Sequence, residues 1–595
     1  MTRLRLALAA CTAGVAACAA PYAWADEAKA EIQGVADKGL RQAIQQYIGQ
    51  SKRAPQSRFD ARRRAEEAAQ DILVVLRSEG YYDYQVTPDV TEGDHPKPVV
   101  KIETGPRFTV TEPQISWANQ PPDAQAEAAA RAALKLPSGT PGRAADILAA
   151  EGRLVGALQK AGYADAAAQP REVVVDHADH TLRPTYRIDA KAKVRLDGLQ
   201  VKTTGRTNPR WVAHLAPWRT GQVYDPDAVA EFERRLLDTG VYTSVTVGLS
   251  PEANADGLRP VLVSLADRSK GTVSLGASYS TTEGVGVNGR YAIYNLFGRA
   301  DTTSFSAQYA SILKRIDVQL SLPQWRAPQR TLQLGATAYR DDTTAFEEND
   351  VGVQADLERR YGKTSFRTIG LSLDLSRDNE KELVGGAIVG EQRDLALATG
   401  LLRLSLDHSD NPLDPSHGWK FDGRIEPTVG TGDQTLAYVK AQAQLSAYLP
   451  FDTAGRTVLA GRLKVGTVLS TGGTPDLPAS RRFYAGGGGS IRGYAYQAVG
   501  PRFPDNTPIG GQSLIESSVE FRQKVGRSLG FVAFADAGTV SAQKYPDFHN
   551  FSIGAGVGLR YDLGFGPLRA DIGVPLNRRT GDAPFQLYLS IGQAF

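Results

Sequence analysis

Apolar and polar residues alternate along most of the chain from about residue 269 onward, and this alternation constrains the fold more than any other feature of the sequence. An alternating segment is typical of a β-strand with one apolar and one polar face. Segments of about ten residues, separated by turn-rich connections, are typical of a transmembrane β-barrel. The strand-like segments lie at 272–279, 301–309, 331–339, 365–375, 397–406, 419–427, 435–448 and 456–469.

Residues 267–595 are therefore predicted to form an all-β transmembrane barrel of 16 antiparallel strands. That number leaves about 21 residues for each strand and its connection, which suits short turns that alternate with longer loops. A soluble β-sandwich is the alternative, but it does not account for the end of the chain. Every second residue from Phe585 to Ile591 is apolar, and the chain ends in Phe595. This ending resembles the C-terminal signal by which outer-membrane barrels are recognised for insertion.

The N-terminal residues have the pattern of an exported protein. A positive head with Arg3 and Arg5 precedes a small, apolar stretch, and Ala-Trp-Ala at 23–25 offers a cleavage site. We therefore expect residues 1–25 to be a signal peptide and the mature protein to begin at Asp26. A membrane anchor is the alternative, but the apolar run is short for a helix that must span a bilayer.

Cysteine occurs only in this leader, as Cys11 and Cys18. A mature chain without cysteine excludes disulfides, thiol catalysis and zinc–thiolate sites. The stretch 15–18 also resembles a lipoprotein cleavage box, which would acylate Cys18, and this is a second interpretation of the leader.

Residues 26–266 differ from the rest, because they are rich in Ala, Arg and Glu and have helical periodicity. One phrase recurs three times: an amphipathic helix, a glycine and a strand. The glycines are Gly80, Gly162 and Gly240, each at a point where a helix must end, which favours left-handed backbone geometry. They lie 82 and 78 residues apart, a spacing typical of tandem domains and too long for a solenoid repeat.

Each repeat is predicted to be an α+β unit of order β-α-α-β-β, with the limits 26–104, 105–189 and 190–266. This order resembles the POTRA domain, a periplasmic module of outer-membrane assembly and secretion proteins. The resemblance implies a sheet edge that accepts an extended client segment, which free N–H and C=O groups permit. The alternative is that the repeats are spacers.

A glycine-rich segment between two strand regions carries the most specific motif. It has no Gly-Lys-Ser/Thr and no following helix, which excludes a phosphate-binding loop, and its glycines permit a tight path with positive φ. Its sequence resembles the (V/I)RG(F/Y) signature of the outer-membrane assembly and two-partner secretion superfamily. The residues are Gly486, Gly487, Gly488, Gly489 and Ser490, followed by the signature itself, Ile491, Arg492, Gly493 and Tyr494.

In that superfamily the signature lies at the tip of a long extracellular loop that folds back into the barrel lumen. Two later stretches, 518–522 and 534–538, match the same family, and the second ends at Gly538. An arginine in a confined lumen must meet carboxylates, which a planar guanidinium suits better than an ammonium does. The expected partners of Arg492 are Asp536 and Glu520, with Arg560 and Asp571 as further members of the network.

Three repeats before a barrel resemble the TamA family, the barrel subunits of the translocation and assembly module. Central assembly factors of the superfamily usually have five repeats. The resemblance implies a non-enzymatic insertase that folds and inserts β-barrel clients such as autotransporters. Its implied partners are a TamB-like protein anchored in the inner membrane, unfolded outer-membrane protein clients and the lipid bilayer. It also implies that the barrel lies in the outer membrane with the repeats in the periplasm, and that the first and last strands meet at a weakly closed seam.

Other functions fit the sequence less well. A two-partner secretion transporter would pass an extended client through the lumen, but its arm has two repeats, and a passive porin does not account for the arm at all. No enzyme, cofactor or metal site is expected, because the seven histidines are scattered and the stretch 176–180 lies in a predicted turn that no third element approaches. The 68 basic and 65 acidic residues give no reason to expect a nucleic acid partner.

Overall fold

The computed structural model describes residues 27–591, apart from 52, 94, 281–283, 363, 527 and 564–566. The predicted signal peptide, its cleavage point before Asp26 and the terminal Phe595 lie outside the described residues. The chain divides into two compact units, the first formed mainly by residues before 198 and the second containing the barrel. No described helix is long and apolar enough to cross a membrane.

The first repeat is a three-stranded sheet covered by two helices. Its central strand β5 is parallel to β2 and antiparallel to β4. Ile72, Leu76 and Val100 are fully buried between the helices and the sheet, and a separate strand pair, β1 (Glu27–Ala28) with β3 (Gln50–Ser51), flanks them. The elements are β2 (Glu31–Gln33), α1 (Lys38–Ile48), α2 (Arg58–Ser78), β4 (Gln85–Val90) and β5 (Pro98–Glu103).

The second and third repeats have the same order. Leu154, Leu158 and Tyr186 are fully buried in the second, and Phe232 and Leu236 in the third. In the second, the short strands β6 (Thr109–Val110) and β8 (Ala167–Ala168) also pair with β10. The elements are β7 (Gln114–Trp117), α3 (Ala124–Ala133), α4 (Ala144–Lys160), β9 (Glu172–Asp176) and β10 (Thr181–Asp189), then β11 (Leu196–Thr203), α5 (Pro209–His214), α6 (Pro226–Leu237), β12 (Tyr242–Leu249) and β13 (Arg259–Asp267).

The repeated glycines end their helices as the sequence predicts. Gly80, Gly162 and Gly240 have φ angles of +90°, +99° and +70°, in the left-handed region that glycine adopts at little cost. The expectation that no third element approaches the turn at 176–180 is wrong. Asp83 of the first repeat lies 2.5 Å from Nδ1 of His177 and 3.2 Å from Nε2 of His180, and all three side chains are partly exposed.

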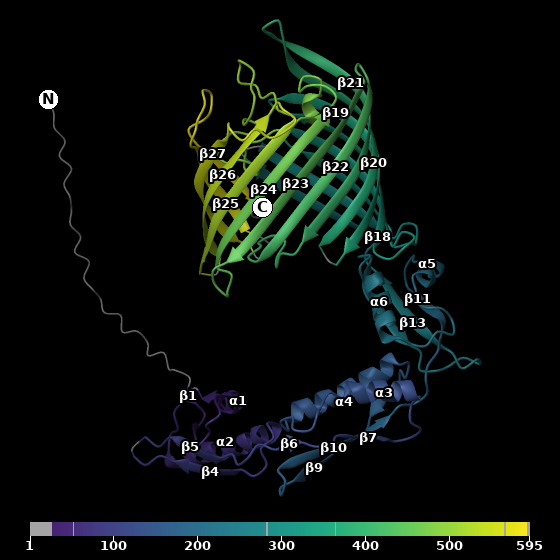
Figure 1. Cartoon of the computed structure of the whole chain (residues 1–595), viewed down its shortest axis with the longest axis vertical. Helices are drawn as coiled ribbons and strands as arrows, with labels where there is room; N and C mark the ends of the chain where they lie inside the picture. The colour runs from purple at the N-terminus through teal and green to yellow at the C-terminus, as the bar shows by residue number, and fades with distance from the viewer. Residues whose placement is uncertain are drawn as a thin grey trace, which may run out of the picture. The chain divides into compact units, whose positions relative to one another are not determined.

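The barrel is a single sheet of 16 antiparallel strands in sequence order (Figure 1), which confirms the predicted fold class. β14 begins and β29 ends at the same end of the barrel, which we call the near end. We call the opposite end the far end. The strands are β14 (Gly271–Ser280), β15 (Gly284–Tyr294), β16 (Thr302–Tyr309), β17 (Leu313–Pro323), β18 (Arg330–Asp342), β19 (Phe346–Tyr361), β20 (Ser365–Val384), β21 (Ala387–Asp407), β22 (Gly418–Gly432), β23 (Leu436–Pro450), β24 (Thr457–Ser470), β25 (Ser513–Val525), β26 (Leu529–Ser541), β27 (Ser552–Asp562), β28 (Pro567–Pro575) and β29 (Gln586–Ile591).

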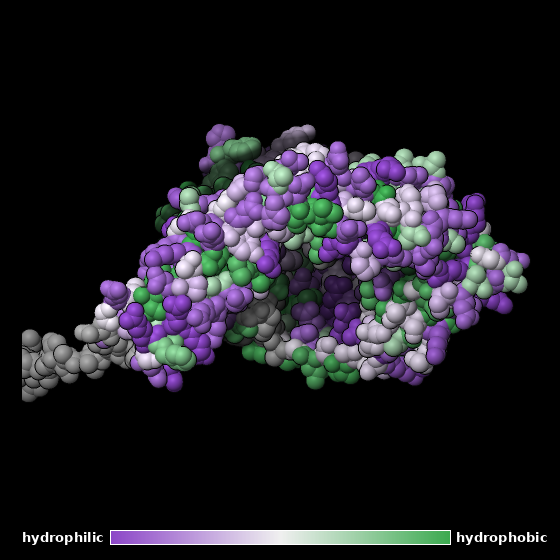
Figure 2. Space-filling model, turned by 90° about the horizontal axis from the view of Figure 1, so that it is seen from below, coloured by the Kyte–Doolittle hydropathy of each residue, from purple (hydrophilic) through white to green (hydrophobic). Residues whose placement is uncertain are grey.

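Alternation along the strands separates an apolar outer face from a polar lumen. Along β17, Ile316 is 63% exposed on the outer face, whereas Arg315 and Asp317 on the inner face form an ion pair of 2.8 Å. Figure 2 shows a hollow, and the residues visible inside it are mainly hydrophilic. An apolar band outside and polar side chains inside are what a bilayer-spanning barrel requires.

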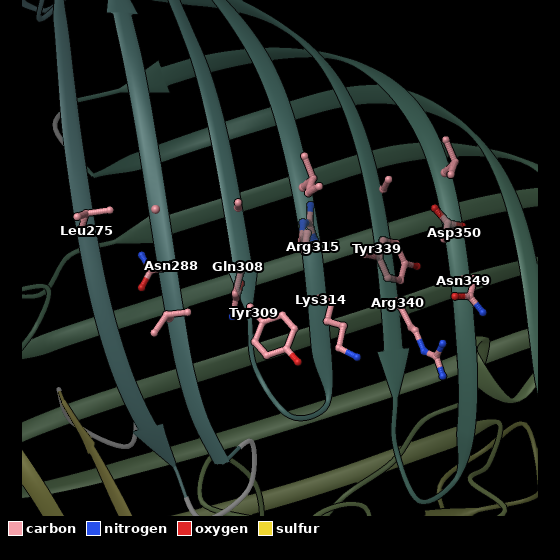
Figure 3. A pocket seen from close by; sticks show the side chains of 16 residues that line it. Leu275, Asn288, Gln308, Tyr309, Lys314, Arg315, Tyr339, Arg340, Asn349 and Asp350 are labelled. Atoms are coloured by element: carbon pink, nitrogen blue, oxygen red, sulfur yellow. The ribbon is translucent and has the colours of Figure 1, made fainter.

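A shallow groove of about 720 Å³ crosses the outer face of β14–β19 (Figure 3). Small residues such as Gly289 and Ala307 lie opposite each other in its floor. Tyr309, Lys314 and Arg340 are neighbours across three strands, close to the turns at the far end. Amphipathic side chains at this level are typical of the boundary between lipid and water.

Helix α4 allows a matched test of the second repeat. Leu154 is fully buried, whereas Leu148 on the same helix is 53% exposed. Leu154→Ala should lower the free energy of unfolding of this repeat by about 2–5 kcal/mol, because it leaves a cavity. Leu148→Ala should change that free energy by less than about 0.5 kcal/mol. Urea-dependent proteolysis of the full chain in detergent measures the free energy of unfolding of both variants. Equal effects of the two substitutions would contradict the burial of Leu154 on one face of α4.

Candidate functional site

The loop at residues 471–512 joins β24 to β25 at the far end and contains the glycine-rich motif. Its apolar side chains pack against the inner wall, so the loop has a core of its own inside the barrel. The members of this core are Leu477, Phe483, Ala485, Ile491, Tyr494 and Val499 of the loop, with Leu395, Leu397, Leu436, Tyr438, Val468, Leu514 and Val540 of the wall. Burial of this apolar surface keeps the motif in the lumen.

Arg492 is held by the two acids that the sequence assigned to it. Its Nε and Nη2 atoms donate to the two oxygens of Asp536 at 2.7 and 2.8 Å, and its backbone N–H donates to the same carboxylate at 3.0 Å. Its Nη1 atom lies 2.5 Å from Oε1 of Glu520. The guanidinium carbon is 3.5 Å from the centroid of the Phe534 ring. Arg492 is 1% exposed, so this contact is shielded from bulk water.

A third carboxylate and three wall arginines complete the cluster. Asp571 of β28 accepts from Nη1 of Arg492 at 3.1 Å. The wall arginines are Arg522, 2.8 Å from Glu520, Arg569, 2.6 Å from Asp571, and Arg560, which also binds Asp571. Four guanidinium groups thus surround three buried carboxylates. Removing one partner from such a cluster is costly, because the remaining charges stay buried.

The loop is tied to three different strands through this cluster. Glu520 lies on β25, Asp536 on β26 and Asp571 on β28, each at a position that faces the lumen. Ser518, two residues before Glu520 and on the same face of β25, donates to Asp536 at 2.5 Å. A single arginine in the loop therefore contacts three strands of the wall.

Only part of the glycine-rich stretch needs glycine for its backbone angles. Gly486, Gly487 and Gly493 have φ angles of +107°, +103° and +100°. Gly488 and Gly489 do not have positive φ, so the expectation of positive φ is wrong for these two. A side chain at Gly488 would crowd the Tyr588 ring, at 3.0 Å from its nearest atom. At Gly489 nothing lies within 4 Å, and the structure gives no reason for its glycine.

Glycines of the wall let the loop backbone approach closely. A Cβ at Gly554 of β27 would collide with the carbonyl oxygen of Arg492, and a Cβ at Gly573 of β28 would lie 2.8 Å from the backbone nitrogen of Gly493. A Cβ at Gly538 would lie 2.8 Å from the side chain of Ile491. The wall thus lacks side chains where the signature lies against it.

A second anchor, which the sequence analysis missed, ties the start of the loop to β19 and β20. Arg481 lies 2.6 Å from Glu348, and Arg482 lies 3.1 Å from Glu380. The backbone N–H of Ala479, in the short 3₁₀ helix η1 (Ala479–Arg481), donates to Glu380 at 2.6 Å. The available signal was the pair of arginines before the motif, whereas Glu348 and Glu380 lie outside the strand segments predicted from the sequence.

The last hairpin, β28–β29, supplies a third set of contacts. Arg502 of the loop lies 2.5 Å from Asp582 in the hairpin turn. The Tyr494 hydroxyl lies 2.5 Å from Oδ1 of Asn577, just beyond β28. The signature tyrosine therefore touches the same hairpin that carries Asp571.

The seam between the first and last strands is not closed by a ladder in the described part of the chain. The sheet runs in order from β14 to β29, and these two strands lie close together without backbone pairing recorded between their described residues. Unpaired strand edges expose N–H and C=O groups that can pair with another strand. The loop cluster and this seam meet at the β28–β29 hairpin.

Comparisons with known proteins agree with this architecture. The family model described as the Omp85 superfamily domain matches residues 295–595, just over half of the chain. The chain is 27% identical over 436 residues to the outer membrane protein assembly factor BamA of Nitratidesulfovibrio vulgaris. The aligned region covers 70% of this chain and 53% of that protein. It is 22% identical over 600 residues to BamA of Neisseria meningitidis, with 89% of this chain and 73% of that protein covered.

A solved structure shares the fold. The crystal structure of BamA from Haemophilus ducreyi lacking POTRA domains 1–3 has a TM-score of 0.69 and 17% sequence identity, and it covers 82% of this chain and all of that one. The chain spans about half the length of two of the curated BamA relatives that it matches. On the family match, the chain belongs to the Omp85 superfamily, as an outer-membrane β-barrel whose N-terminal POTRA domains lie in the periplasm.

Proposed function

We propose that this protein folds and inserts other β-barrel proteins into the outer membrane. The observation that carries the proposal is the buried contact of Arg492 with Glu520, Asp536 and Asp571, which we call the latch. The strands of the wall that carry these acids continue to the seam, which no ladder closes in the described chain. A client strand could pair with the free edges at that seam, as extended segments do at open sheet edges. The relatives named as outer membrane protein assembly factors support the same function.

Within the superfamily we propose a TamA-type protein with a TamB-like partner and autotransporters among its clients. The support is the β-α-α-β-β order that occurs three times before the barrel, with the proposed limits 26–104, 105–189 and 190–266. Co-purification after expression with the gene of a long, β-rich, inner-membrane-anchored protein tests the partnership. Failure of the two proteins to associate would remove this branch and leave the assembly function in place.

The rival function is a secretion pore that passes an extended client through the lumen. The loop at 471–512 lies in the lumen and is anchored to both sides of the barrel, through Arg492 and through Arg481 and Arg482. A pore would need this loop to leave, whereas an insertase that works at the seam can keep it in place.

The latch predicts a specific defect. Arg492→Ala should leave the barrel inserted, because the strand ladders do not depend on it, but client assembly should fall sharply. Removing one partner of a buried cluster costs about 3–5 kcal/mol, which shifts a loop equilibrium by about a hundredfold or more. Arg492→Lys should restore only part of the activity, because one ammonium cannot bind Asp536 in the bidentate manner. The measurement is the folding rate of a urea-denatured barrel client in liposomes, at matched amounts of inserted protein.

Arg403→Ala is the matched control for this prediction. Arg403 pairs with Asp422 at 2.8 Å in the wall, and both side chains are more than a third exposed, so the pair contributes little. Unchanged assembly with Arg492→Ala would contradict the role of the latch, and an equal loss in both variants would show that any lost arginine has the same effect.

The pairing itself can be tested by a double-mutant cycle. Arg492→Ala leaves Asp536 with less cationic compensation, and Asp536→Asn leaves Arg492 with less anionic compensation. The double variant should therefore slow assembly less than the two single variants together predict. The difference should correspond to about 1–3 kcal/mol of activation free energy. Strict additivity would mean that the two groups act independently.

A covalent lock separates the insertase from the pore. Oγ of Ser490 in the loop lies 2.5 Å from Oε1 of Glu516 in the wall, and the chain has no cysteine after residue 25. The thiols of the double variant Ser490→Cys with Glu516→Cys should therefore be bridged by a short thiol-specific crosslinker, which holds the loop in the lumen. After crosslinking an insertase should keep its assembly rate, whereas a pore should lose its activity. Loss of activity on crosslinking, with none in the two single variants, would favour the pore.

A further inference from the structure

Tyr588 of the last strand reaches the signature of the loop. Its hydroxyl accepts a hydrogen bond from the backbone N–H of Gly493 at 3.0 Å and donates one to the carbonyl oxygen of Tyr494 at 2.8 Å. The residue is 5% exposed, and its ring lies against the backbone at Gly488. Both partners are backbone groups of the loop, so a phenylalanine at this position would keep the ring contact and lose both bonds.

The described part of the last strand, Gln586–Ile591, pairs with β28, and no ladder joins its described residues to β14. Net contributions of individual hydrogen bonds are small but add up. The two bonds of the Tyr588 hydroxyl therefore add to what the ladder with β28 supplies.

The loop also holds this hairpin through β28. Arg569 of β28 donates to the carbonyl oxygen of Gly488 at 2.7 Å, and Arg492 binds Asp571 of the same strand.

We propose that the loop signature holds the last strand in the wall through the Tyr588 hydroxyl, so that the state of the loop sets how often β29 leaves the seam. Tyr588 is a positioning residue in this scheme, because it acts on the strand and makes no contact that requires a client. The inference rests on the proposed function in one respect only, namely that seam opening lets a client strand pair there.

The test is amide hydrogen exchange of residues 586–590 in the full chain, inserted in lipid nanodiscs and read by mass spectrometry. Alternate amides of β29 point to β28 and exchange when β29 detaches from it, so the rate at these amides follows the detached fraction. Tyr588→Phe should raise the rate about tenfold, as expected for the loss of two buried hydrogen bonds. Tyr561→Phe is the matched control, because Tyr561 is 47% exposed on the outer face of β27. An unchanged exchange rate in Tyr588→Phe would overturn the inference.

Coupling to the loop is tested with Arg492→Ala. This variant should also speed exchange at 586–590, and it should add little when combined with Tyr588→Phe, because both changes break one connection. Additive effects would mean that Tyr588 acts apart from the latch, which would overturn the coupling.

Client assembly, measured in parallel, separates the two proposals. Faster exchange with a changed assembly rate supports both the inference and the role of the seam. Faster exchange with an unchanged assembly rate supports the inference and contradicts assembly at the seam. Unchanged exchange with reduced assembly overturns the inference and leaves the proposed function standing.

Discussion

The buried guanidinium of Arg492 is the contact on which the arrangement of the loop depends. A long loop in a water-lined lumen gains little from exposed contacts, so it needs a partner whose charges are shielded from solvent. Asp536 offers two oxygens in the plane of the guanidinium, and Glu520 and Asp571 take up the remaining Nη1 atom. This geometry fixes both the position and the orientation of the loop tip, because a bidentate contact does not rotate freely.

The latch also explains why the wall around it is unusual. Gly554 and Gly573 leave the inner face of β27 and β28 bare exactly where the loop backbone lies, since a Cβ at either position would meet Arg492 or Gly493. Glycine in a strand weakens that strand, because it adds flexibility and packs no side chain. The wall near the seam thus accepts a local loss of strand stability in exchange for a close fit to the loop.

Much of this could be predicted from the sequence, for reasons that can be traced to particular residues. The barrel could be predicted because apolar and polar residues alternate with a period of two. The helix ends could be predicted from Gly80, Gly162 and Gly240, since both features depend on local geometry. The pairing of Arg492 with Asp536 followed from a signature and from charge. The anchor at Arg481 and Glu348, and the contact of Tyr588 with the loop, could not be derived, because they depend on which strands the loop crosses. The two ends of each contact are 133 and 95 residues apart.

The same dependence on distant contacts governs how the seam can open. Along the sheet each strand is held by two neighbours, but β14 and β29 are each paired with one neighbour in the described chain. β14 has ten residues in its ladder with β15, and the described part of β29 has six in its ladder with β28. The loop adds contacts to the last hairpin, at Tyr588, Asp571 and the hairpin turn. A seam built in this way opens at a rate set by the loop as well as by the ladders, because the loop must release these contacts before the last strand can leave.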